Sequence, residues 1–162
     1  MSDRLAVLPQ YLLPKQLLTT LAGRLASAHA GSLTTAAIRR FVARYHVDMS
    51  EAAEPDITGY ASFNDFFTRA LRPGLRPLAD AAVVCPVDGA VSQLGPIERD
   101  QIFQAKGHHY STTALLGGNA QLAAQFEDGH FATTYLRPRD YHRIHMPVDG
   151  RLLSMEPVPG AP

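Results

Sequence analysis

The segment Thr133–Pro147, TTYLRPRDYHRIHMP, is rich in side chains that can donate, accept or carry protons. It holds His142, His145, an aspartate, two tyrosines and several arginines within fifteen residues. Imidazoles exchange protons near neutral pH, which makes histidine the commonest general acid or base in enzymes. A purely structural segment rarely needs so many of these groups together. The segment therefore indicates proton-transfer chemistry.

A second segment, Cys85–Gly95 (CPVDGAVSQLG), offers a lone carboxylate, Asp88, on an Asp-Gly turn between apolar flanks. Paired with His145 or His142, this carboxylate would fix the tautomer of the imidazole, which would then take a proton from a hydroxyl group. Hydroxyl groups are available, but none lies in a Gly-x-Ser-x-Gly elbow; they belong to Ser92, Ser111, Thr133 and Thr134. The pattern alone leaves open a Ser-His-Asp site or ordinary turn and strand residues.

The pair His142-x-x-His145 also raises the possibility of a metal site. Zinc would need at least one further ligand, and the candidates are His108, His109, His130 and Asp140. However, two histidines three residues apart lie on opposite faces of a regular strand. Because the chain has neither a His-Glu-x-x-His motif nor a cysteine cluster, we expect no metal. A metal-dependent hydrolase that uses the two histidines remains a minor alternative.

Two amphipathic helices are predicted in the amino-terminal part of the chain. Residues 10–29 place leucines at helical spacing, and residues 33–46 form a second apolar face that includes Ile38 and Phe41, with Gly31-Ser32 as a break and cap. Three arginines occupy the other side of the second helix, namely Arg39, Arg40 and Arg44. The helices either pack on a core or lie in a membrane interface with the arginines near lipid phosphates.

The residues Ser62 to Asp65 form a capping box that predicts the start of a further helix. Its apolar face contains Phe63, Phe66 and Phe67, and Pro73-Gly74 is expected to end it. A phenylalanine cluster of this kind is typical of a protein core, although part of it could line a groove for acyl chains.

From about residue 82 the pattern changes to short strands punctuated by glycine and proline. Strands are predicted at 83–86, 90–94, 130–136, 141–146 and 151–155, and short helices at 111–117 and 119–128. Asp88-Gly89 and Asp149-Gly150 read as turns. These features predict an α+β fold. Residues 1–80 would form a helical, membrane-contacting region, and residues 81–162 an incomplete, mostly antiparallel β-rich domain.

Composition limits the classes of protein that fit the chain. It is 46% hydrophobic and 19% charged, as is ordinary for a globular protein, and a single cysteine excludes an intrachain disulfide. Residues 1–48 carry six basic and two acidic side chains, a net charge of +4, whereas the rest carry nine and thirteen, a net charge of −4. An anionic membrane surface suits this amino-terminal charge. Nucleic acid does not, because aromatic residues do not interleave a basic stripe.

Targeting signals also limit the location. No run of eighteen apolar residues could form an ordinary membrane-spanning helix, and Pro9 and Pro14 interrupt any signal-peptide pattern. We expect a peripheral protein on the cytoplasmic side of the cell membrane.

At these residues the sequence resembles the phosphatidylserine decarboxylases, in the amino-terminal part of the bacterial form. The matching segments are FNDFFTRALRPGLRPL at 63–78, PVDGAVSQLGPI at 86–97, QAKGHHYSTTALLGG at 104–118 and TTYLRPRDYHRIHMPVDG at 133–150, together with the opening YLLPKQLLTTLAGRLA. The resemblance implies a carboxy-lyase of phospholipid biosynthesis that converts phosphatidylserine to phosphatidylethanolamine and carbon dioxide.

The resemblance also implies a cofactor and residue roles. Family members cut their own chain at a serine, which becomes a pyruvoyl group on a small subunit and serves as the electron sink for decarboxylation. By position, Asp88 matches the aspartate that orients the histidine for this cleavage, and His145 matches that histidine, the base that activates the serine. His142 matches a histidine near the substrate carboxylate that takes part in the proton steps of decarboxylation.

The sequence departs from the family pattern in one respect. It contains no Leu-Gly-Ser-Thr segment, from which the pyruvoyl serine would come, and it ends where the family continues. We therefore expect the isolated chain to be inactive, and we expect the small pyruvoyl subunit as its partner. A homodimer is a further expectation. The alternative is a non-catalytic, peripheral membrane-binding remnant.

Overall fold

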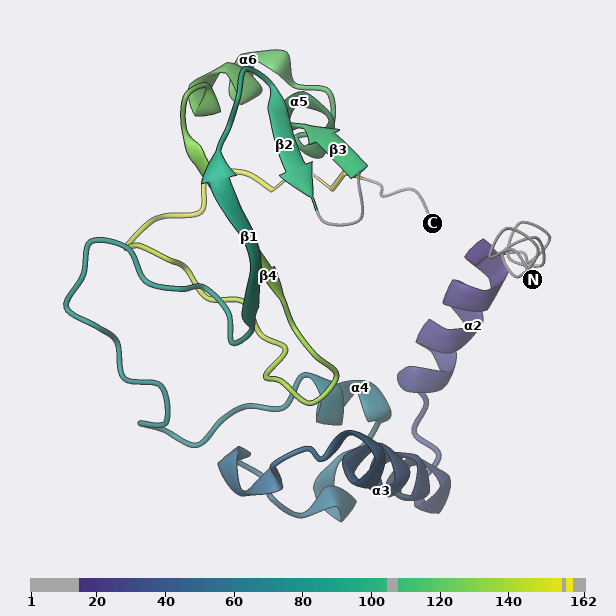
Figure 1. Cartoon of the computed structure of the whole chain (residues 1–162). Helices are drawn as coiled ribbons and strands as arrows, with labels where there is room; N and C mark the ends of the chain where they lie inside the picture. The colour runs from purple at the N-terminus through teal and green to yellow at the C-terminus, as the bar shows by residue number, and fades with distance from the viewer. Residues whose placement is uncertain (1–14, 105–107, 156, 159–162) are drawn as a thin grey trace, which may run out of the picture.

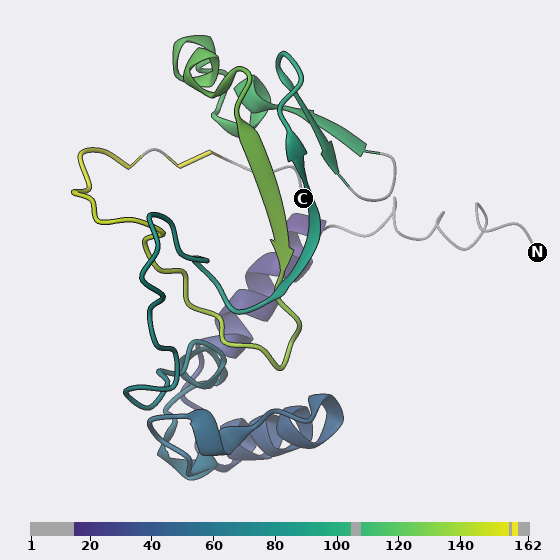
Figure 2. The ribbon, with the colours of Figure 1, turned by 60° about the vertical axis from the view of Figure 1, so that its left-hand side comes forward.

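The structure, a computed structural model, describes residues 15–104, 108–155 and 157–158. Its helices are α2 (Lys15–Ala26), α3 (Ser32–Tyr45), α4 (Phe63–Phe67), α5 (Thr112–Leu115) and α6 (Ala120–Ala123), with short 3-10 turns η1 (Met49–Glu51), η2 (Ile57–Gly59) and η4 (Ala124–Phe126). Its strands are β1 (Ala90–Pro96), β2 (Gln101–Gln104), β3 (His108–Ser111) and β4 (His130–Tyr135). Helices α3 and α4 lie at one end, and the β1–β4 ribbon leads to β2, β3, α5 and α6 at the other (Figures 1 and 2). The predicted α+β class is confirmed.

The helical end has a compact aromatic core. Ile38 of α3 and Phe66 of α4 are fully buried, and Val47 joins them. The ring of Phe41 packs edge-on against Phe63 and Phe66, with centroid distances of 5.1 and 5.8 Å. Edge-to-face packing is favoured by the aromatic quadrupole in addition to the burial of apolar surface. The prediction that the phenylalanine cluster forms core is confirmed for Phe66.

Helix α4 begins as predicted but ends early. The Ser62 hydroxyl accepts from the Asp65 amide, and the Asp65 carboxylate accepts from the Ser62 amide, both at 3.1 Å. The helix stops at Phe67, so the expectation that Pro73-Gly74 ends it was wrong. The chain leaves the helix because the following residues hydrogen-bond elsewhere: the Ala53 amide to the Ala70 carbonyl and the Arg72 amide to the Glu51 carbonyl, each at 2.9 Å.

The two amino-terminal helices differ in how they are used. Helix α3 starts at Ser32, yet Gly31 is its cap and no side chain caps it, which corrects the predicted role of Ser32. In α2 the leucine stripe remains exposed: Leu17, Leu18, Leu21 and Leu25 are 56, 46, 45 and 74% accessible. Residues 10–14 of this predicted helix lie outside the described residues. Among the described helices, none has the length and apolarity to cross a membrane.

The β part consists of two separate antiparallel pairs. Strands β1 and β4 run from Ala90 opposite Tyr135 to Pro96 opposite His130, with an irregularity between Val91 and Gln93. Both strands were predicted. Strands β2 and β3 form a hairpin that the sequence did not predict, because polar residues predominate there and only Ile102 is buried among those whose burial is described.

Three predicted strands are not formed. Residues 83–86, 141–146 and 151–155 are irregular, and the predicted hairpin at Asp149-Gly150 has no strand after it. The first two segments nevertheless meet: the Val84 amide donates to the Pro147 carbonyl at 2.9 Å and the His145 amide to the Pro86 carbonyl at 2.8 Å. Pro86 and Pro147 have no N–H to return these bonds, so a regular ladder cannot propagate.

Candidate active site

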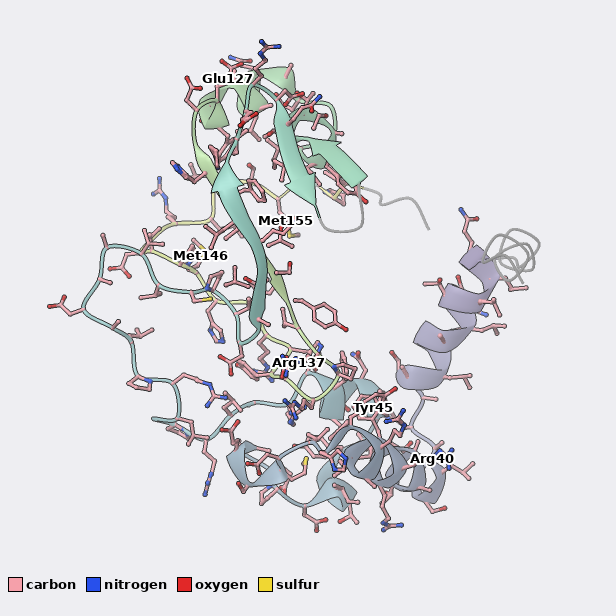
Figure 3. All side chains as sticks on the ribbon, viewed as in Figure 1. Arg40, Tyr45, Glu127, Arg137, Met146 and Met155 are labelled. Carbon is pink, nitrogen blue, oxygen red and sulfur yellow. The ribbon has the colours of Figure 1, made fainter. Side chains whose placement is uncertain are left out.

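The end of α4 holds the loop that carries His142. The guanidinium of Arg69 donates to the Arg139 carbonyl at 3.1 Å, and that of Arg143 donates to the Thr68 carbonyl at 2.8 Å. The Phe67 ring lies against the His142 imidazole with a centroid distance of 4.0 Å. Arg137, labelled in Figure 3, belongs to the same loop after β4. Three contacts from consecutive residues thus set the position of the loop.

The hydrogen bond of His142 fixes its tautomer. Its Nδ1 atom lies 2.8 Å from the Asp140 carbonyl oxygen. A carbonyl oxygen can only accept, so Nδ1 carries the proton and donates it. The Nε2 atom of the neutral ring is then an acceptor. The loop therefore presents Nε2 as the atom of His142 that can take up a proton.

His145 is fixed through its backbone and its ring. Its amide is bound to the Pro86 carbonyl, and its Nε2 atom lies 3.1 Å from the Tyr141 hydroxyl. The two rings stack with an interplanar angle of 22° and centroids 5.6 Å apart. Tyr141 is buried, with 9% of its surface accessible. A phenol can both donate and accept, so Tyr141 can serve either protonation state of Nε2.

Asp88 is held by an arginine. The Nε atom of Arg76 donates to its carboxylate at 2.6 Å, and Nη2 of the same guanidinium donates to Glu51 at 2.9 Å. Hydrogen bonds to Glu51 and then to Asp88 raise the pKa of Arg76 above its ordinary value. Next to Asp88, Gly89 passes the end of β4 so closely that a Cβ atom would lie 2.7 Å from the Tyr135 carbonyl oxygen. The turn that carries Asp88 therefore requires glycine.

Several charged side chains line one cavity of about 240 Å³. Its lining residues are His46, Asp48, Glu51, Arg69, Arg76, Asp88, Arg139, Asp140 and Tyr141. Asp88 also lines a neighbouring cavity of about 230 Å³ with Gly89, Ala90, Arg137 and Asp140. Asp88 and Tyr141 thus line the same cavity, and Tyr141 also contacts His145.

The structure does not pair Asp88 with His145 directly. Among the described residues, the carboxylate of Asp88 is hydrogen-bonded to Arg76 and the ring of His145 to Tyr141. His142 contacts Phe67 and is not among the residues that line the cavity of about 240 Å³. The expected carboxylate–imidazole pair therefore stays a prediction for the complete protein.

Sequence reasoning missed the roles of two arginines that flank the exit of α4, Arg69 and Arg76. Arg69 is only 4% exposed, and its Nε and Nη1 atoms have no hydrogen-bond partner among the described residues. Burial lowers the pKa of Arg69. A fully buried arginine is rare without a partner. Three arginines within eight residues, at 69, 72 and 76, were the available signal.

Two of the hydroxyl groups named for a Ser-His-Asp site have hydrogen-bond partners among the described residues. The Ser92 hydroxyl donates to the Thr133 carbonyl at 3.1 Å, and the Ser111 hydroxyl caps α5 by accepting from the Ala114 amide at 3.0 Å. In the part of the chain that the structure describes, no three histidine, cysteine or acidic side chains gather where they could share a metal ion. His142 and His145 engage different aromatic partners, Phe67 and Tyr141.

Comparisons with known proteins identify a family for the chain. The family model for phosphatidylserine decarboxylase matches residues 63–161, and a second model, described as PSD, matches residues 5–46. Curated relatives named phosphatidylserine decarboxylase proenzyme include those of Acidovorax ebreus (strain TPSY), 82% identical, Delftia acidovorans, 74%, and Methylibium petroleiphilum, 72%. The alignments cover 99% of this chain and 57, 56 and 56% of the respective relatives, so the chain spans just over half of their length.

Proposed function

Since this chain belongs to the phosphatidylserine decarboxylase family, we propose that the complete protein converts phosphatidylserine to phosphatidylethanolamine and carbon dioxide. The observation that carries the proposal is the family match over residues 63–161, which contain Asp88, His142 and His145. The relatives' printed name, proenzyme, describes a precursor. We infer that this precursor cuts itself and that the resulting pyruvoyl group is the cofactor.

The residues present suit such a group. The Nδ1 atom of His145 has no hydrogen-bond partner among the described residues, while Tyr141 holds the opposite nitrogen. An imidazole held in this way can accept the proton of a serine hydroxyl that is brought to its open side. The pyruvoyl carbonyl, once formed, supplies an electron sink for the loss of carbon dioxide.

Three side chains of this chain would take part in the proton transfers. His145 would act as the base in self-cleavage through its Nδ1 atom, and Asp88, which lines the same cavity as Tyr141, would orient it through that phenol. His142 would use Nε2, the nitrogen left free by its bond to Asp140, to take or return the proton of the decarboxylation step.

An exposed apolar surface supports a partner for the carboxyl-terminal part of the chain. Ile144, Met146, Leu152, Leu153 and Met155 are between 64 and 85% accessible, and Figure 3 labels Met146 and Met155. Apolar side chains so close in sequence are usually covered in a finished protein. The remaining part of the complete protein, which would contain the small pyruvoyl subunit, is the proposed cover. A homodimer remains an additional proposal.

The amino-terminal helices would attach the protein to a membrane. The leucines of α2 are exposed, and so are Arg39, Arg40 and Arg44 of α3, of which Figure 3 labels Arg40. Such a combination favours the interface of an anionic membrane. We propose peripheral binding on the cytoplasmic side of the cell membrane.

The first step of the test is to sequence the source DNA downstream of codon 162 and to express the complete gene. The complete gene product should split into two bands on a denaturing gel and release carbon dioxide from phosphatidylserine vesicles. A complete product that binds vesicles but neither splits nor releases carbon dioxide would favour the non-catalytic membrane protein instead. Stoichiometric zinc in the purified protein would revive the metal-dependent hydrolase.

A further inference from the structure

We propose that Arg76 is a positioning residue, which fixes the Asp88 carboxylate at the cavity wall by tying it to Glu51 at the helical end of the molecule. The inference rests on the proposed function, because Asp88 is assigned there to the self-cleavage step. It adds two residues to that step, neither of which the family resemblance identified.

The geometry of the guanidinium carries the proposal. Arg76 bonds Asp88 through Nε at 2.6 Å and Glu51 through Nη2 and Nη1 at 2.9 and 3.4 Å. The donors of a guanidinium have a rigid planar arrangement. Two carboxylates bound to different edges of one guanidinium therefore have a fixed relative position. A lysine ammonium has no such fork, and it could not hold both carboxylates in this arrangement.

Glu51 is well suited to be the anchor. Its carbonyl accepts from the Arg72 amide at 2.9 Å, and the neighbouring Ala52 forms a bridge with Leu71. Ala52 is fully buried. The backbone after Glu51 is thus paired with the segment around Leu71, whereas Asp88 lies on a turn outside any regular element. Arg76 thus ties the position of the Asp88 turn to that of the helical end.

The solvent exposure of the three side chains distinguishes a positioning role for Arg76 from a role in folding stability. The side chains of Arg76, Glu51 and Asp88 are 42, 39 and 30% accessible. Ion pairs with this much exposure contribute little to folding stability. Replacing Arg76 should therefore leave the melting temperature nearly unchanged while it changes the behaviour of Asp88.

The experiment measures self-cleavage of the complete gene product. We expect Arg76→Gln to slow cleavage about tenfold to a hundredfold, as the loss of a charge-assisted hydrogen bond implies. Arg76→Lys should slow it nearly as much, because the ammonium has no planar fork, and Glu51→Gln should have a smaller effect. In Arg76→Ala, millimolar guanidinium, far below denaturing concentrations, should restore part of the rate. Arg72→Gln is the matched control, since this exposed arginine lies on the same segment and its side chain has no hydrogen-bond partner among the described residues.

The outcomes distinguish the two proposals. A wild-type precursor that stays uncleaved refutes the proposed function and this role with it. A wild-type precursor that cleaves, beside an equally fast Arg76→Gln variant, refutes the role alone. So does slow cleavage that is matched by a large fall in melting temperature and is not rescued by guanidinium.

Discussion

The amide of His145 donates a 2.8 Å hydrogen bond to the carbonyl of Pro86, two residues before Asp88. This bond joins the histidine segment to the turn that carries the carboxylate, although the two segments are almost sixty residues apart in sequence. The side chains meet only through Tyr141 and the cavity wall. The backbone therefore brings the proposed base and its carboxylate into one neighbourhood, although their side chains are not hydrogen-bonded to each other among the described residues.

Replacing Asp88 or His145 with alanine should leave the complete precursor uncleaved. Without His145 no imidazole takes the serine proton, and without Asp88 its orientation is lost. A denaturing gel after prolonged incubation provides the measurement. Asp149→Ala is the control, because this aspartate lies in the second PVDG sequence and was assigned no chemistry. Normal processing of the Asp88 or His145 variant would contradict its assignment.

Replacing His142 with alanine should allow cleavage but depress turnover. Its Nε2 atom is proposed to move a proton only in the decarboxylation step, and general acid–base catalysis typically contributes about 10²- to 10⁴-fold. The measurement is carbon dioxide release per cleaved protein. Full activity in this variant would remove His142 from the mechanism.

Replacing Tyr141 with phenylalanine should slow self-cleavage while preserving the stack on His145. The change removes only the hydroxyl that lies 3.1 Å from Nε2, so this nitrogen would lose its hydrogen-bond partner and the imidazole would be held less firmly. Cleavage rates followed from pH 5 to 9 should show a profile altered in shape, not merely scaled. A profile identical to that of the wild type would show that Tyr141 only packs.

Replacing Arg39, Arg40 and Arg44 with glutamate should weaken pelleting with anionic vesicles. Each basic residue near such a surface contributes about 1 kcal/mol, so the combined change should exceed about a hundredfold. The matched control reverses Arg99 and Arg151, which lie in the β part of the chain. If the α3 variant pellets like the wild type, the helices pack on protein instead of lipid.

Replacing Phe66 with alanine should lower the free energy of unfolding by about 3–5 kcal/mol, because this side chain is fully buried in the aromatic core. Urea denaturation gives the value. Phe66→Leu, which keeps most of the volume, should cost much less. Equal losses for both variants would indicate that the core does not depend on filling this space.

The sequence was sufficient to predict features that depend on neighbouring residues. Helix α3 follows from its apolar periodicity, the start of α4 from the Ser62–Asp65 capping box, and β1 and β4 from short runs between glycine turns. The motifs around Asp88, His142 and His145 carried enough information to identify the family. Each of these signals depends on residues that are close in sequence, so it can be recognised without knowledge of the fold.

The tertiary structure decided which of these residues meet. Only the folded chain shows that Arg76 bonds Asp88 and Glu51, that the end of α4 holds the His142 loop, and that Tyr141 both lines the cavity and contacts His145. Prolines at 86 and 147 turned two predicted strands into irregular segments, since a missing N–H matters only opposite a partner. Long-range hydrogen bonds depend on where distant backbones pass, and no local spacing encodes that.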